Sequence, residues 1–178
     1  NFEYVLQGQE KDFQTGLDAL AKIAKTHLGI CVCQKNPALT GAKNVTVTTF
    51  EGANPAGNVG VQINHVDPIN KGEIVWTLGA EEVIFIGRLF NNGHVDFTRT
   101  IALAGSEVKK PAYCKVKVGA KLTGIFAGRV ENAQPLRYIN GNPLTGVQTC
   151  AEGYLAAHAT SLTVIPDGAD NHELLGFI

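Results

Sequence analysis

Residues 54–112 constrain the fold of this 178-residue chain more than any other stretch. Along the sequence they have the pattern of a loop, a helix, a strand, a second helix and a second strand, and Gly, Pro or Asn marks each transition. Helices that alternate with strands are typical of an α/β layer. Short strands and turns dominate after this stretch, so the pattern predicts an α/β module followed by a β-rich module.

An amphipathic helix is predicted near the start of the chain. Between positions 10 and 26 apolar residues recur at helical spacing, with charged residues on the opposite side. His27 and Gly29 are predicted to close this helix, because a cation is favourable at the negative end of a helix and Gly often ends one.

Two strands are predicted next. The run LGICVCQ at 28–34 predicts a strand that is buried on both faces, as in a parallel sheet. A polar loop follows at 36–44, and the β-branched run at 44–50 predicts the second strand. The segment VGVQINHVD at 59–67 would suit a strand or a helix, and we expect a helix.

The end of the first module is predicted from a strand, a helix and a further strand. A short strand is expected at 74–77, with Trp76 in the core. The helix at 80–90 is apolar on almost every side, so it is expected to pack between layers, and Asn92-Gly93 is expected to end it. Alternating apolar residues then predict a long strand at 94–105.

The second module is expected to be a small β-grasp-like unit, because short strands surround a single short helix. Its predicted elements are a strand at 112–120, a helix at 122–127, a tight turn at 140–143 and a strand at 161–168. The boundary is expected between Leu89 and Val95, which gives domains at 1–94 and 95–178. The fold class is therefore α/β in the first domain and α+β overall.

One loop is a candidate binding site. Residues 51–58 lie between a predicted strand and a predicted helix, where α/β folds hold phosphates on backbone amides. The candidate residues are Gly52, Asn54, Gly57 and Gly60. The loop has neither a GxGxxG nor a P-loop pattern, Pro55 removes an amide donor, and Glu51 would repel a phosphate. We interpret it as a structural loop inherited from a nucleotide-binding ancestor; retained nucleotide or flavin binding is the alternative.

No catalytic residue and no metal site are predicted. Residues 64–67 form the only local cluster of His and Asp, which we interpret as a helix end. Ser106 and Ser161 are the only serines, and neither lies in GxSxG, which excludes a nucleophile-elbow hydrolase. The histidines have no metal-ligand spacing.

The four cysteines are expected to be buried free thiols in a reducing compartment. Cys31 and Cys33 lie two apart in a predicted strand, so both would point to one face and could not form an unstrained disulfide. With Cys114 and Cys150 they have neither a zinc nor an iron–sulfur spacing.

Composition and sequence pattern argue against nucleic-acid-binding, membrane-spanning and secreted proteins. The net charge of −1 and the absence of a basic face argue against a nucleic-acid partner. No apolar run reaches the roughly 20 residues of a membrane span, and the N-terminus lacks the pattern of a signal peptide. Because the chain begins with Asn and contains no Met, we expect it to be part of a longer polypeptide.

Several motifs together carry a family resemblance. They are Gly8–Gly16, Asn54–Gly57, Asp67-Pro68, Val75-Trp76, Val83–Phe90, Arg99–Gly105, the run YINGNPLTG and the closing ELLGFI. In this order they resemble the A (alpha) subunit of the sodium-translocating NADH:quinone oxidoreductase. The family more often has His where Asn54 stands, so no catalytic role is expected for that loop.

The resemblance implies a function. Members of this family belong to a bacterial membrane complex that oxidises NADH, reduces ubiquinone and exports sodium. The A subunit is peripheral, on the cytoplasmic side of the inner membrane, and has been associated with quinone contact. The resemblance also implies a Rossmann-like domain followed by a β-grasp domain, and a decayed flavin site. NADH oxidation, flavins and iron–sulfur centres are implied for other subunits, so this chain is expected to bind no cofactor and to dock against them.

Two alternatives are kept. One is the C subunit of an Rnf-type electron-transport complex, which would carry cysteine-rich ferredoxin motifs further downstream. The other is a stand-alone protein that binds a flavin or a dinucleotide.

Overall fold

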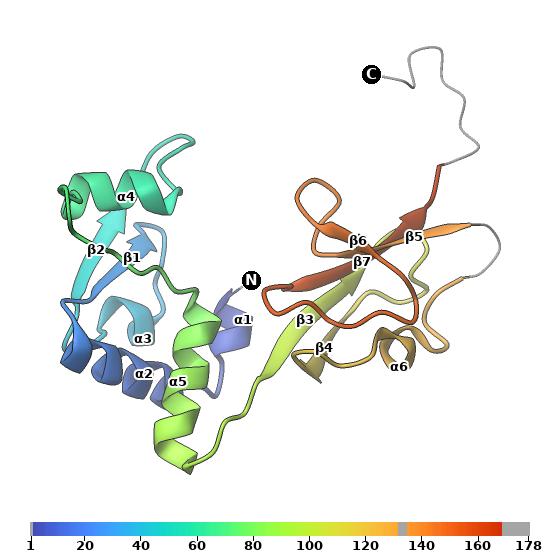
Figure 1. The fold of residues 1–178 in the computed structure, drawn as a ribbon, viewed down its shortest axis with the longest axis horizontal. Helices are drawn as coiled ribbons and strands as arrows, with labels where there is room; N and C mark the ends of the chain where they lie inside the picture. Colours follow the sequence, from blue (N-terminus) through green and yellow to red (C-terminus); the bar gives the residue numbers. More distant parts are fainter. Residues whose placement is uncertain (1, 132–134, 169–178) are drawn as a thin grey trace. The chain divides into compact units, whose positions relative to one another are not determined.

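The computed structural model describes residues 2–131 and 135–168 (Figure 1). They belong to two compact units, and the division falls between Asp96 and Phe97 in the sequence. The closing motif at 173–178 lies outside the described residues. Within the described ranges, no helix combines the length and the apolar composition that crossing a membrane requires.

The first unit alternates helices with two parallel strands. Its elements are α1 (Phe2–Leu6), α2 (Glu10–Ile23), β1 (His27–Cys31), α3 (Pro37–Thr40), β2 (Thr46–Phe50), α4 (Val59–Val66) and α5 (Ala80–Asn92). The register of β1 and β2 runs from His27 beside Thr46 to Cys31 beside Phe50. The predicted α/β class is confirmed, but over the described residues this sheet has only these two strands.

Helices α2 and α5 form the packed centre of the first unit. A Cβ atom at Gly87 would overlap the backbone carbonyl of Asp12, and one at Gly16 would overlap that of Val83. These glycines therefore let the two helix backbones approach closely. The buried apolar residues around them are Leu6, Phe13, Leu17, Ile30, Leu39, Val83 and Ile84.

The predicted helix end and the buried strand need correction. Helix α2 ends at Ile23, and Ala24 is already extended, so His27 and Gly29 lie in β1 and do not close the helix. Strand β1 ends at Cys31, and only Ile30 is buried in it, because a two-stranded sheet cannot be covered like the centre of a large one. The sequence also missed α3, where the Asn36 side chain accepts a hydrogen bond from the Ala38 amide at 2.9 Å.

The predicted strand at 74–77 is wrong. This segment joins α4 to α5 without regular secondary structure, and Trp76, expected in the core, is 86% exposed. Helix α5 is confirmed, as is its end, where Gly93 takes a left-handed conformation with φ 74°. It does not pack between layers, because Phe90 and Leu89 are exposed on its outer side.

The second unit is a mixed sheet with one helix. Its elements are β3 (Thr98–Ala104), β4 (Ala112–Lys117), α6 (Leu122–Phe126), β5 (Leu136–Asn140), β6 (Val147–Thr149) and β7 (Ser161–Pro166). The strand order is β4-β3-β7-β5-β6, with β3 and β7 parallel and the other neighbours antiparallel. This arrangement is the predicted β-grasp.

The order of the strands explains which residues of this unit are buried. Strands β3 and β7 are central and carry Ile101, Leu103, Leu162 and Val164, which are almost fully buried. Strand β3 begins at Thr98, four residues later than predicted, because its pairing with β4 begins at Thr98 beside Lys117. The predicted tight turn at 140–143 is instead part of a longer loop, 141–146, between paired Asn140 and Val147.

The cysteine prediction is wrong in two respects. Cys31 and Cys33 form a disulfide, with their Cα atoms 5.2 Å apart. The chain turns directly after Cys31, so Cys33 is not in the strand and the argument from strand faces does not apply. Cys114 and Cys150 are free thiols as expected, but neither is buried: Cys114 is half-buried and Cys150 is exposed.

Candidate functional site

The candidate loop at 51–58 has the predicted position. It leaves the end of β2 at Phe50 and enters α4 at Val59, so it lies at the carboxyl end of a parallel strand and the start of a helix. Ligands of open α/β sheets usually bind at such a place. Asn58 is the N-cap of α4, but its side chain forms no capping hydrogen bond.

The loop is folded onto its own backbone. The Ala56 amide donates to the Ala53 carbonyl at 3.0 Å, and the Asn58 amide donates to the Pro55 carbonyl at 2.8 Å. The Gln62 side chain, one turn into α4, donates to the Ala56 carbonyl at 3.2 Å. The amides of Ala56 and Asn58 are thus already bonded within the loop, and Pro55 has no amide hydrogen.

The four candidate residues are all exposed to solvent. They are Gly52, with φ +142°, Asn54, Gly57 and Gly60. A Cβ atom at Gly57 or Gly60 would meet nothing within 4 Å. Gly52, Asn54 and Gly57 thus lie in the exposed loop and Gly60 in the first turn of α4.

A hollow of about 340 Å³ lies elsewhere in the first unit, where the strands begin. It is lined by Ala21, Ala24, Lys25, Thr26, Asn44, Val45 and Thr46. None of the four candidate residues lines it, because the candidate loop follows the opposite end of β2.

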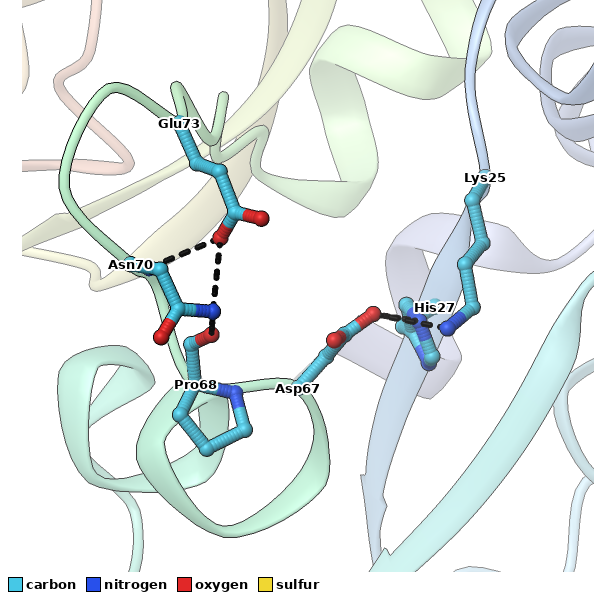
Figure 2. Close-up of polar contacts among 6 residues, drawn as sticks. All are labelled: Lys25, His27, Asp67, Pro68, Asn70 and Glu73. Atoms are coloured by element: carbon cyan, nitrogen blue, oxygen red, sulfur yellow. Dashed lines mark hydrogen bonds and ion pairs between the residues drawn. The ribbon is translucent and has the colours of Figure 1, made fainter.

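A charged cluster beside this hollow joins α4 to the start of β1 (Figure 2). Asp67, the C-cap of α4, accepts a hydrogen bond from Lys25 Nζ at 2.7 Å, and His27 Nε2 lies 3.3 Å from the same oxygen. The hydrogen bond from Lys25, then the charges of Lys25 and His27, hold the pKa of the Asp67 carboxyl below its usual value of 3.8. Lys25 and Asp67 are both exposed, so they form an ion pair on the surface.

Sequence reasoning did not find this cluster. The local pair His65 and Asp67 looked like the only His/Asp cluster, but His65 Nδ1 lies 2.8 Å from the Val61 carbonyl, one turn back. The histidine that approaches Asp67 is His27, and Lys25 is 42 residues away from Asp67 in sequence. No spacing signal could have shown it, because only the pairing of β1 with β2 and the return of α4 bring these residues together.

The turn after Asp67 is held by its own side chains, as Figure 2 shows. The Glu73 carboxylate accepts from the Asn70 amide at 2.7 Å and from the Asn70 side chain at 3.2 Å. The Asn70 side chain also contacts the Pro68 carbonyl at 3.4 Å. These contacts shape the Asp-Pro turn. Over the described residues, no group of three or more His, Cys, Asp and Glu side chains could hold a metal ion.

Comparisons with known proteins identify the family. Residues 1–95 match the family described as the NqrA second alpha/beta domain, and residues 100–151 match the NQRA C-terminal domain. Similar proteins are the A subunits of the Na(+)-translocating NADH-quinone reductases of Actinobacillus pleuropneumoniae serotype 5b, 34% identical over 99% of this chain, and of Neisseria meningitidis serogroup C, 33% identical over 98%. The A subunit of the same reductase in Rhodopirellula baltica is 32% identical over 97% of this chain.

The chain spans about two fifths of the length of these relatives: 40%, 39% and 38%. The matches extend across both units and confirm the resemblance to the A subunit of the sodium-translocating reductase. The chain therefore belongs to the NqrA family, the A subunits of the Na(+)-translocating NADH-quinone reductases.

Proposed function

We propose that this chain is part of the A subunit of a bacterial complex that oxidises NADH, reduces ubiquinone and exports sodium. The observation that carries the proposal is the match to NqrA proteins over 99% of the chain. In this proposal the two units serve assembly: they present surfaces to the other subunits on the cytoplasmic side of the inner membrane, close to the quinone.

The geometry of the candidate loop supports a scaffold rather than a catalytic role. Its amides at Ala56 and Asn58 already bond within the loop, and its glycines are exposed to solvent. A flavin or a dinucleotide buries most of its surface in a concave site. We infer that the loop has kept the strand–loop–helix geometry of a nucleotide site without the binding.

The loop variants Gly57→Ala and Gly60→Ala test this proposal in the full-length NqrA protein within its complex. Because an added Cβ meets nothing within 4 Å at either position, both variants are expected to fold. NADH-driven quinone reduction should stay within about twofold of the unsubstituted complex. A tenfold loss in either well-folded variant would show that the loop contacts a reacting group or a cofactor.

Direct titration tests the alternative of a stand-alone binding protein. FMN and NADH are added separately to the isolated NqrA protein, and visible absorbance and calorimetry are recorded. No binding tighter than about 10 μM, which is roughly −7 kcal/mol, is expected. Tighter binding that Gly57→Ala weakens would assign a retained nucleotide site to the loop.

The proposed closeness to quinone has its own test. A photoreactive quinone analogue is added to the intact complex, and labelled peptides are mapped along the NqrA polypeptide. Labelled peptides within this chain are expected. Labels confined to other subunits would reduce the proposal to assembly alone.

A further inference from the structure

The segment Ile74–Leu78 has the composition of a β-strand but no strand to pair with. Its sequence, IVWTL, consists of β-branched, aromatic and aliphatic residues, and the first four of them are of the kinds most enriched in strands. Within the described part of the chain, these five residues make no hydrogen bond to another backbone group; the bonds on either side join Glu73 to Asn70 and Val83 to Gly79. Figure 1 draws the segment as coil between α4 and α5.

The side chains of this segment are also uncovered. Ile74 is 82% exposed and Trp76 86%, while Val75 and Leu78 are close to half exposed. Four large apolar side chains within five consecutive residues are therefore open to solvent. Single exposed apolar residues are ordinary, but a group of neighbouring ones is typical of a surface that another element covers.

The sheet of the first unit also has free edges. In the described residues it consists of β1 and β2 alone, which leaves edges with unpaired backbone groups. In the same described residues, the backbone of Ile74–Leu78 likewise has no strand partner.

We propose that a strand from the same polypeptide, from the part of the NqrA protein that has no counterpart in this chain, pairs with Ile74–Leu78 and covers Trp76. More than half of each relative's length lies outside the match, so ample polypeptide is present. A tethered strand competes well with separate molecules, because linkage gives it a millimolar effective concentration. The occupant is an extended segment with an apolar face toward Ile74 and Trp76. This inference does not depend on quinone contact or on NADH oxidation.

Hydrogen exchange of the unsubstituted, isolated full-length NqrA protein tests the pairing without any mutation. A single partner strand bonds alternate amides, so about half of the amides in Ile74–Leu78 should exchange at least roughly a hundredfold slower than in an unstructured chain. Exchange at the unstructured rate would overturn the proposal, including the case in which protection develops only in the assembled complex.

Photo-crosslinking identifies the occupant. The variant Trp76→p-benzoylphenylalanine is made in the full-length protein, irradiated alone and within the complex, and the linked peptides are mapped by mass spectrometry. The expected product joins position 76 to a peptide of the same polypeptide outside residues 1–178, without a change in the mass of the polypeptide on a gel.

The control variant for cross-linking is Leu144→p-benzoylphenylalanine. Leu144 is 94% exposed in the loop between β5 and β6, so it provides the background of an isolated exposed side chain. A cross-link from position 76 to a second copy, to another subunit or to any residue within 1–178 would overturn the proposal. So would a yield no higher than that of the Leu144 control.

Discussion

At the scale of single residues, Asp67 shows how a surface carboxylate can fix a turn. It ends α4, accepts from Lys25 at 2.7 Å and lies 3.3 Å from His27 Nε2. Lys25 lies just before β1, and His27 is the first residue of β1. The group is exposed, so solvent screens the pairing, and its effect is small in free energy. Its effect on titration is directly measurable.

Replacement of Lys25 by Met should raise the pKa of Asp67 toward 3.8. The hydrogen bond and the charge of Lys25 are the largest causes of the lowered pKa, and both are lost in this variant. Carboxyl-carbon NMR titration measures this. Asp18 is the matched control: hydrogen bonds from Asn44 and then Gln14 lower its pKa, so Lys25→Met should leave it unchanged. An unchanged Asp67 pKa in this variant would contradict the observed pairing.

The lowered pKa of Asp67 also makes the free energy of unfolding depend on pH. Because the folded pKa of Asp67 lies below 3.8, the unfolded state binds more protons in that range. The stabilisation is therefore complete above about pH 5 and is lost as the pH falls through the lowered folded value. The difference in unfolding midpoint between the unsubstituted protein and Asp67→Asn should be largest near neutral pH and should shrink as the pH falls below the unfolded value of 3.8 and through the lowered folded pKa.

At the scale of secondary-structure elements, the contact between α2 and α5 organises the first unit. Gly16 and Gly87 lie where the two helices cross, and each faces the backbone of the other helix rather than only a side chain that could move aside. Around them Phe13, Leu17 and Ile84 are almost completely buried. The helix pair depends on close backbone approach as well as on apolar burial.

Gly87→Ala should lower the free energy of unfolding of the first unit by about 3 kcal/mol, because the added methyl group overlaps the Asp12 carbonyl and forces the helices apart. Urea unfolding monitored by circular dichroism measures the change. Gly60→Ala, in the first turn of α4 with nothing within 4 Å, is the control and should be neutral or stabilising by up to about 1 kcal/mol. Equal effects of the two substitutions would show that α2 and α5 do not cross closely.

At the scale of the whole molecule, each unit has a hydrophobic core of its own. One contains Leu6, Phe13 and Ile84, and the other is built on β3 and β7 with Leu162 fully buried. Units with separate cores can unfold separately.

Leu162→Ala should cost the second unit about 3 kcal/mol, because it leaves a cavity in the central strand β7. Hydrogen exchange should accelerate in the peptides of β3, β5 and β7, while those of α2 and α5 keep the rates of the unsubstituted protein. Val147→Ala, at an exposed edge-strand position, is the control and should change neither unit by more than about 0.5 kcal/mol. Equal acceleration in both units would show that they unfold as one.

Local patterns in the sequence determined much of the architecture. The apolar period predicted α2, Asn92-Gly93 predicted the end of α5, and a β-branched run predicted β2, because these signals act within a few residues. Family motifs that extend across the chain predicted the NqrA relationship, which the comparisons confirm.

Only the tertiary structure decided which residues meet and which surfaces stay open. His27 beside Asp67, the turn that joins Cys31 to Cys33, and the crossing at Gly87 all depend on backbone paths that no local pattern encodes. Trp76 was expected in the core because its sequence is strand-like, yet it is exposed. The physical reason is the same in each case: propensity acts on neighbours in sequence, whereas burial and pairing depend on which distant segments are present to supply contacts.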